Sequence, residues 1–271
     1  MARVIVITHQ QDNFCNRHYL IQGFFSHWRE MGHEIYLTAG TDAKISGDIA
    51  FLHVDCSVID DAYLEYAKRF PITLNLSTRD IRKSAISRSL VRPSDGWTGP
   101  VVVKSNLNCG GMPEREHNRI AAHNREVLPH KSAKVFEQYQ ILDSPTMVPR
   151  RVWKNPALVV ERFLPERDEH GFWLRCWVFL GDRERCNRYL GSAAIVKGSE
   201  TTLSESVPVP AELREMRARL RFDYGKFDFA MHQGRPILFD ANRTPGSAPN
   251  LVSMFARNAA NLAAGINVFL K

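Results

Sequence analysis

Two apolar stretches near the carboxyl end of the chain, residues 226–231 and 236–241, constrain the fold more than any other feature of the sequence. A short glycine-containing turn separates them, which predicts an antiparallel pair of strands. Asp228 lies in the first strand, and Asp240 and Asn242 lie at the end of the second. Residues two apart on a strand share a face, and paired strands direct side chains to a common face, so these three side chains are expected to converge.

Oxygen donors in such a position indicate a cation site. A solvated hairpin explains one aspartate in a strand, but it explains this set poorly, because Asp and Asn are depleted in strands. Magnesium takes hard oxygen ligands, uses few protein side chains and is completed by substrate phosphates. The sequence therefore favours magnesium at Asp228, Asp240 and Asn242.

A polar glycine loop follows a second apolar strand. Residues 101–104 read Val-Val-Val-Lys and lead to Gly110 and Gly111. A lysine at a strand end can reach a phosphate as a point charge, and a Gly-Gly loop brings backbone N–H groups close to polyphosphate oxygens. The sequence lacks the Gly-Lys-Ser/Thr of a Walker A loop. Taken alone, the segment is explained equally well by a plain strand and turn.

The third informative segment is residues 157–168, an apolar strand that ends in acidic and proline positions. Such a strand end can form a hinge whose backbone pairs with an adenine edge while a carboxylate binds ribose hydroxyls. By itself, the segment is better explained as an ordinary strand end.

The first 76 residues alternate apolar strands with helical patterns. We expect strands at 3–7, 34–38, 49–54 and 72–76, and helices at 17–31 and 60–69. This alternation predicts a small parallel α/β unit. It carries no GxGxxG after its first strand, so a dinucleotide-binding fingerprint is absent.

Farther along the chain the patterns are mixed. We expect strands at 101–104, 158–163 and 173–180, and helices at 78–91, 114–128, 211–221 and over the final 22 residues.

Composition excludes several protein classes. The chain has 271 residues, 44% hydrophobic and 24% charged, which suits a compact globular protein rather than a disordered or fibrous one. No apolar run approaches the ~18 residues of a membrane span. The five cysteines are scattered and contain no CxxC pair, so a reducing cytoplasm is the expected location.

The net charge of +7 raises the question of an anionic partner. The basic residues recur in short groups rather than one block, so they are either solvated helix faces or a cradle for polyphosphate and an acidic substrate; charge alone does not decide. No nucleic-acid recognition motif is present, and no nucleic acid is expected. The spacing of His117, His123 and His130 excludes a helical zinc pair, and we expect these side chains to be solvated.

In their order along the chain, the three segments resemble the ATP-grasp superfamily, above all the ribosomal-protein glutamate ligase group and D-alanine–D-alanine ligase. The spacing of Asp228 from Asp240 and the Asp240-Ala241-Asn242 ending are similar to the metal site of that family. The strand with Arg175 is similar to a glutamate-ligase strand, and the turn 244–246 resembles one in D-alanine–D-alanine ligase. The resemblance covers about residues 77–250.

The resemblance implies an α/β (α+β) ATP-grasp fold. Its expected parts are an N-terminal α/β domain, residues 1–76, a central lobe, residues 77–160, and a C-terminal lobe with the metal site, residues 161–271. The two lobes would clasp ATP.

The resemblance also implies roles for individual residues. Lys83 and Lys104 would hold the ATP phosphates beside Gly110 and Gly111, and Glu161, Phe163 and Leu164 would form the adenine hinge. Asp168, with Glu166 as its competitor, would bind ribose, and Lys226 or Arg175 would stabilise an acyl phosphate. Asp228, Asp240 and Asn242 would hold one or two magnesium ions, or manganese.

The activity implied is that of an ATP- and magnesium-dependent carboxylate–amine ligase, which activates a carboxylate as an acyl phosphate and releases ADP and phosphate. Its substrates would be a small-molecule or peptide carboxylate and an amine, and a homo-oligomer is compatible with the family. Positive charge at residues 79–92, Arg175 and the turn 243–250 favours an acidic substrate. The alternatives are a small-molecule kinase on the same scaffold, a nucleotide-binding protein without catalysis, and a basic nucleic-acid-binding protein.

Overall fold

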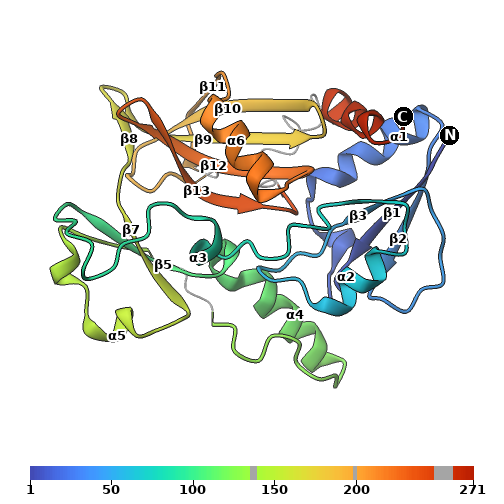
Figure 1. The fold of residues 1–271 in the computed structure, drawn as a ribbon, viewed down its shortest axis with the longest axis horizontal. Coiled ribbons are helices and arrows are strands. Elements are labelled where there is room, and N and C mark those ends of the chain that lie inside the picture. The colour runs from blue at the N-terminus through green and yellow to red at the C-terminus, as the bar shows by residue number, and fades with distance from the viewer. Residues whose placement is uncertain (135–138, 198–199, 247–258) are drawn as a thin grey trace.

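The computed structural model describes residues 1–134, 139–197, 200–246 and 259–271. The described strands form three sheets (Figure 1). In Figure 1 the largest sheet lies at the top, the N-terminal sheet at the right and the smallest sheet at the lower left.

The N-terminal sheet is parallel, as the sequence predicted, with the spatial order β2-β1-β3-β4. Its strands are β1 (Arg3–Thr8), β2 (Glu34–Ala39), β3 (Ile49–Leu52) and β4 (Ile72–Leu74), and its helices are α1 (Phe25–Glu30) and α2 (Asp61–Ala67). Val4 and Val6 of β1 pack on the α1 side, whereas Ile5 and Ile7 pack on the α2 side. Apolar residues on both faces of β1 are what a sheet covered on both sides requires.

The smallest sheet is antiparallel, with the order β6-β5-β7. Its strands are β5 (Val101–Ser105), β6 (Gln140–Leu142) and β7 (Leu158–Arg162), and it is accompanied by α4 (Met112–His123) and α5 (Arg150–Trp153). Every residue of β5, the central strand, is buried.

The largest sheet is also antiparallel, with the order β11-β10-β9-β12-β13 and β8 paired to β9. Its strands are β8 (Glu166–Asp168), β9 (Gly171–Leu180), β10 (Arg183–Gly191), β11 (Leu203–Ser206), β12 (Tyr224–His232) and β13 (Arg235–Asn242). Trp177 and Phe179 of β9 pack under α6 (Ala211–Leu220). Val178 and Leu180 of the same strand face the core that contains α1. The large sheet thus joins the N-terminal unit to the rest of the chain.

Two predicted helices are wrong in extent. Residues 17–31 form a 3-10 helix, Leu20–Phe24, followed by the short α1. Residues 78–91 contain only α3 (Lys83–Ile86). The chain after α3 is extended because its backbone pairs with β7: Val91 N–H donates to Val160 O, and Arg162 N–H donates to Ser89 O.

The last predicted helix is described only in part. Leu251, Met254 and Phe255, which carry much of its pattern, lie outside the described residues, whereas residues 259–263 are helical and a 3-10 helix, Ala264–Val268, follows. Within the described ranges, no helix has the length and apolar character needed to cross a bilayer. The division at residues 76 and 160 stays a prediction, and β7 runs across the second boundary.

Candidate functional site

A cavity lies between the smallest sheet and the largest one. Its walls are mostly apolar, and charged side chains reach it from both sheets. The lining residues are Val102, Lys104, Tyr139, Arg162, Phe163, Leu164, Pro165, Trp173, Leu174, Ala194, Ile195, Val196, Asp228, Phe239 and Asp240. An apolar slot with a few convergent polar groups is the usual form of a small-molecule site. Of the expected site residues, Lys104, Phe163, Leu164, Asp228 and Asp240 line this cavity.

The hairpin of β12 and β13 brings the acidic residues together. Its register places Asp228 opposite Asp240 and Lys226 opposite Asn242, with a bulge after Asp228. The Lys226 ammonium lies 2.8 Å from Asp228 Oδ2. Burial lowers the pKa of Lys226, but Asp228, followed by Cys176 and Cys109, together raise it by more, and the net pKa lies above that of an ordinary lysine. Lys226 therefore remains a cation beside the carboxylate pair.

Lys83 connects the acidic hairpin to the glycine loop. Its side chain is fully buried at the start of α3, with Nζ 2.9 Å from Asp240 Oδ1, and it donates a hydrogen bond of 3.0 Å to Leu107 O. Burial lowers the pKa of Lys83, but Asp240, Tyr139 and Glu161 together raise it by more, so the net pKa lies above that of an ordinary lysine. The three lysines Lys83, Lys104 and Lys226 in turn hold the pKa of Asp240 below its ordinary value, against the effect of burial. Asp240 is thus an anion.

A second buried ion pair lies on the other side of the cavity. Lys104 Nζ of β5 is 2.7 Å from Glu161 Oε2 of β7, and both side chains are buried. The same ammonium lies 5.1 Å from the ring centre of Phe239 and 5.7 Å from that of Tyr139. Glu161 Oε1 has no hydrogen-bond partner within the described ranges. Lys104 therefore faces the cavity with its charge partly compensated.

The loop after β5 has the backbone that its sequence predicts. Cys109, Gly110 and Gly111 have φ of 46°, 67° and 84°, which is the left-handed region. A Cβ on Gly111 would lie 3.0 Å from both Leu107 Cδ1 and Lys134 O, so glycine is required there by space as well as by conformation. The loop leads directly into α4.

Arg175, Glu166 and Asp168 are not among the residues that line the cavity. The Arg175 guanidinium forms a two-pronged ion pair with Glu166, at 2.7 Å and 2.8 Å, and Glu166 also accepts the Met231 N–H. Asp168 accepts hydrogen bonds from Trp173 Nε1 and His170 N. To bind ribose or an acyl phosphate, Arg175 and Glu166 would have to break their ion pair, and Asp168 would have to give up its present hydrogen bonds. The roles of these three residues stay predictions.

Two of the three expected metal ligands fit a cation as they stand. Asp228 and Asp240 present carboxylate oxygens to the cavity, and Asp240 Oδ1 forms no aligned hydrogen bond with the described residues. Asn242 differs, since its amide oxygen accepts the N–H of Thr244 at 2.8 Å and it is not among the residues that line the cavity. The Thr244 hydroxyl lies 3.1 Å from the same oxygen but donates its one proton to Asp55, so one of the two lone pairs of the Asn242 amide oxygen remains for a metal.

Sequence reasoning missed a buried acidic network beside Asn242. The Tyr19 hydroxyl donates to Asp55 at 2.9 Å and lies 3.2 Å from Asp12, while the Thr244 hydroxyl donates to Asp55 at 2.6 Å. Burial, and then the charge of Asp55, raise the pKa of Asp12 to about 7. The network joins three segments that are far apart in the chain, residues 12–19, Asp55 and Thr244, so no local pattern could have revealed it.

Asp12 gives the protein a testable pH dependence. Its pKa in the folded protein, about 7, lies above its ordinary value of 3.8, so the native state binds this proton more tightly than the unfolded state does. The free energy of unfolding should therefore fall as pH rises from about 4 to about 7, by about 4 kcal/mol from this group, given ~1.4 kcal/mol per pKa unit.

Urea denaturation of wild type and Asp12→Asn at pH 5 and pH 8 measures this effect. The variant should lose that part of the dependence, whereas the exposed control Asp182→Asn should keep it. An equal pH dependence in wild type and Asp12→Asn would show that Asp12 ionises normally.

Comparison with known proteins gives the fold a name. No protein-family model and no curated protein matches the sequence. Solved structures match along its whole length. The RimK domain protein ATP-grasp from Sphaerobacter thermophilus has 14% identity and a TM-score of 0.53, with 98% of this chain and 100% of that chain covered. The ATP-grasp ligase PsnB complexed with minimal precursor has 12% identity and a TM-score of 0.53, with both chains fully covered.

A second structure of PsnB, complexed with minimal precursor, Mg and ADP, has 12% identity and a TM-score of 0.51, with 97% of this chain and 96% of that chain covered. At these identities the likeness shows the fold. The chain has the ATP-grasp fold, and the prediction made from the order of its motifs is confirmed.

Proposed function

We propose that the protein is an ATP- and magnesium-dependent carboxylate–amine ligase. The observation that carries the proposal is the cavity itself, in which an apolar slot, two carboxylates and a buried lysine from the opposite sheet meet within an ATP-grasp fold. The structure of PsnB with Mg and ADP supports nucleotide and magnesium as the ligands of this site.

The slot suits a nucleotide base. Phe163 and Leu164 follow β7 and, with Val102 and Phe239, give the cavity flat apolar walls. Lys104 lies at the same cavity, where an ammonium can bind phosphate oxygens as a point charge. The base would therefore lie against Phe163 and Leu164, with the phosphates directed toward Asp228 and Asp240.

Magnesium would be held by Asp228 and Asp240, and by the remaining lone pair of the Asn242 amide oxygen. When bound, the ion neutralises the charge of the phosphates.

The lysines supply positive charge that does not depend on the ion. Because the Asp228 and Asp240 carboxylates keep the pKa values of Lys226 and Lys83 above the ordinary lysine value, both side chains are protonated at neutral pH. Fixed cations at the transferring phosphoryl group stabilise the charge that develops there.

The proposed reaction has two steps. A substrate carboxylate oxygen attacks the γ-phosphorus of ATP, and ADP leaves with the electrons of the broken P–O bond, which gives an acyl phosphate. An amine then attacks the acyl carbon, phosphate leaves, and the amine loses a proton as the amide forms. Lys226 is placed better than Arg175 to stabilise the acyl phosphate, because its partner Asp228 lines the cavity whereas Glu166, the partner of Arg175, does not.

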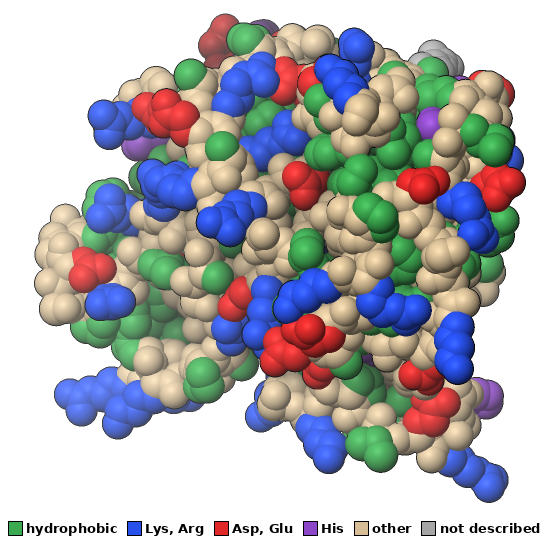
Figure 2. Space-filling model, turned by 45° about the vertical axis from the view of Figure 1, so that its right-hand side comes forward, with side chains coloured by type: hydrophobic (Ala, Val, Ile, Leu, Met, Phe, Trp, Pro, Cys, Tyr) green, Lys and Arg blue, Asp and Glu red, His purple; other side chains and the backbone are tan. Residues whose placement is uncertain are grey.

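The substrates are proposed by class. A small-molecule or peptide carboxylate and an amine fit the reaction, and the minimal precursor bound to PsnB supports a substrate beyond the nucleotide. On the face shown in Figure 2, the Lys and Arg side chains alternate with Asp and Glu rather than forming one continuous basic surface. This distribution favours a small acidic ligand over a nucleic acid.

Calorimetric titration with ATP, with and without magnesium, tests the site. We expect magnesium-dependent binding in wild type, weakened at least about 100-fold in the double variant Asp228→Asn, Asp240→Asn, because the ion would lose both charged ligands. Asp182→Asn, an exposed aspartate outside the cavity, is the control. A folded wild type that binds no nucleotide would overturn the proposal.

A screen for ADP release with carboxylate and amine mixtures tests the reaction. We expect ADP release that requires both substrates, with an amide product found by mass spectrometry. ADP release with a phosphorylated alcohol as the product would instead identify a kinase.

A further inference from the structure

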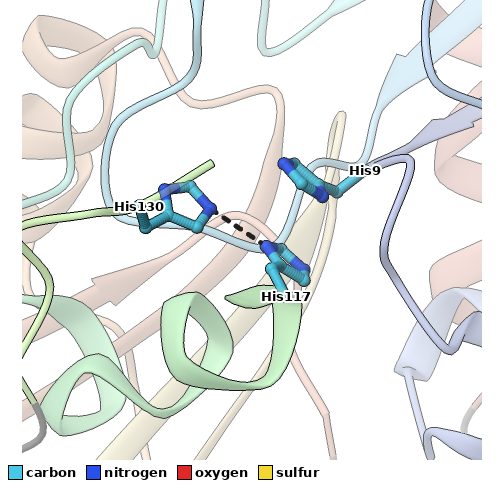
Figure 3. A group of neighbouring side chains, drawn as sticks. All are labelled: His9, His117 and His130. Carbon is cyan, nitrogen blue, oxygen red and sulfur yellow. Dashed lines mark hydrogen bonds between the residues drawn. The ribbon is translucent and has the colours of Figure 1, made fainter. Parts of the chain in front are cut away.

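Three histidines from three separate segments meet in the interior, contrary to the expectation that His117 and His130 are solvated (Figure 3). His9 follows β1, His117 lies in α4, and His130 lies in the segment after α4. One ring nitrogen from each lies within 4.8 Å of the others. His9 and His117 are buried and His130 is partly buried. The spacing within residues 117–130 misled because the third histidine, His9, follows β1 and is far from the other two in the sequence.

The rings are already in contact. His9 and His117 stack with ring centres 3.8 Å apart and planes within 3° of parallel, and His117 Nδ1 lies 3.1 Å from His130 Nε2. Only one of these two nitrogens can carry the shared proton, so the other presents a lone pair. Asn118 fixes His130 through two hydrogen bonds of 2.9 Å, one to its carbonyl and one from its N–H.

All three imidazoles are neutral at neutral pH. Burial, followed by the neighbouring histidines, lowers the pKa of His9 to about 4 and that of His117 to about 2; burial also lowers the pKa of His130. The neutral imidazole is the form that binds metals. Negative charge that could offset a bound dication is also close to the histidines. The carboxylates of Glu114 and Asp60 act on His130, and Asp60 also acts on His9.

Glu114 supplies part of this negative charge. Its side chain is buried at the start of α4; Oε1 accepts the Ser57 N–H at 2.7 Å, and Oε2 has no hydrogen-bond partner among the described residues. A buried carboxylate with a free oxygen beside neutral imidazoles is stabilised by an added positive charge.

We propose that His9, His117 and His130 bind a divalent transition metal of the zinc class. Zinc takes imidazole nitrogens at about 2.0–2.1 Å, with tetrahedral geometry and water in an open fourth position. The nitrogens must approach one another, so the stacked rings of His9 and His117 tilt. If His9 binds through Nδ1, it gives up the hydrogen bond of 3.1 Å that this atom accepts from Gln11 N–H.

The proposed site differs from the carboxylate pair in the cavity by its ligand chemistry. Imidazole nitrogens select zinc, copper or nickel over magnesium, which prefers oxygen. The metal would tie the loop after β1 to α4 and to the segment that follows it, to which a hydrogen bond from Gln11 to Glu126 already connects that loop. Metal binding is thus expected to raise the melting temperature of the whole chain.

The test is a zinc titration of the full chain against a chromophoric chelator, in excess magnesium, with cobalt absorption as a second measurement. The variants are His117→Gln and His130→Gln, and the control is His123→Gln, an exposed histidine of the same helix. We expect wild type and the control to bind one zinc ion with equal affinity. Zinc should raise the melting temperature of both proteins, and cobalt bound to either should give the absorption spectrum of a tetrahedral site. Each variant should bind zinc at least about 10-fold more weakly.

Two results would overturn the site. One is a folded wild type that binds no zinc; the other is equal zinc affinity and equal cobalt spectra in wild type and in either folded variant. His130 is only partly buried, so His130→Gln decides the question if His117→Gln fails to fold.

Discussion

Replacing Lys83 with methionine should lower the free energy of unfolding by about 3 kcal/mol, the cost of breaking a buried ion pair from one side. The Lys83 side chain is fully buried with its nitrogen 2.9 Å from Asp240 Oδ1, and methionine leaves that carboxylate with less compensation. Lys104 and Lys226 also stabilise the Asp240 carboxylate, so the loss of unfolding free energy should lie at the lower end of the range known for broken buried ion pairs. Urea denaturation measures it, with the exposed Lys68→Met as control.

The double variant Lys83→Met, Asp240→Asn separates folding from ligand binding. Removing both charges takes away the uncompensated carboxylate, so most of the lost stability should return. Affinity for ATP should stay at least about 10- to 100-fold below that of wild type, because the variant loses one charge-assisted phosphate contact, worth about 1.5–3 kcal/mol, and also the proposed magnesium ligand Asp240. If the double variant stays as unstable as the single one, the ion pair is not the source of the stability.

The hairpin of β12 and β13 was predictable because the information that defines it is local. The alternation of residues 226–231 and 236–241 and the short turn between them set the register, and the register places Asp228 opposite Asp240. The parallel order of the N-terminal strands follows in the same way from their alternation with helices. The prediction of the ATP-grasp fold depended on the order of three motifs along the chain, because no single motif identifies the fold.

The helix expected at 78–91 shows where local patterns fail. Its composition favours a helix, but its backbone groups pair with β7, and that partner lies some seventy residues away in the chain. Tertiary pairing overrides propensity in such a segment. Lys83 is nevertheless held beside Asp240, because the single turn of α3 begins at this residue.

Clusters built from distant segments leave no trace in a local pattern. His9 is separated from His117 by more than a hundred residues, and Asp12 and Asp55 reach Thr244 from the opposite end of the chain. Each of these residues alone is ordinary in sequence. Only the packing of the N-terminal sheet against β9 and α4 brings them together.

Arg243 was expected to help read a substrate carboxylate, and its surroundings indicate a structural role instead. The side chain is fully buried, and its guanidinium donates hydrogen bonds to the carbonyls of Cys56, Thr78 and Arg79. These contacts join the end of β13 to the N-terminal unit. Both terminal nitrogens are engaged by backbone oxygens, whereas Nε is buried and has no hydrogen-bond partner among the described residues.

Arg243→Met should therefore lower the free energy of unfolding by about 3–5 kcal/mol, because it leaves buried carbonyls unpaired at roughly 1–3 kcal/mol each. Arg243→Lys keeps the charge but cannot reproduce the planar fork that reaches three carbonyls, so it should recover only part of the loss. Urea denaturation of both variants, beside the exposed control Arg151→Met, measures the difference. Two results together would instead support a role in substrate binding. Arg243→Met would have the stability of wild type, and its ADP release would depend less on the carboxylate substrate. The depth of burial argues for the first outcome, because a side chain that binds a substrate must be reached by it, and Arg243 has no exposed surface.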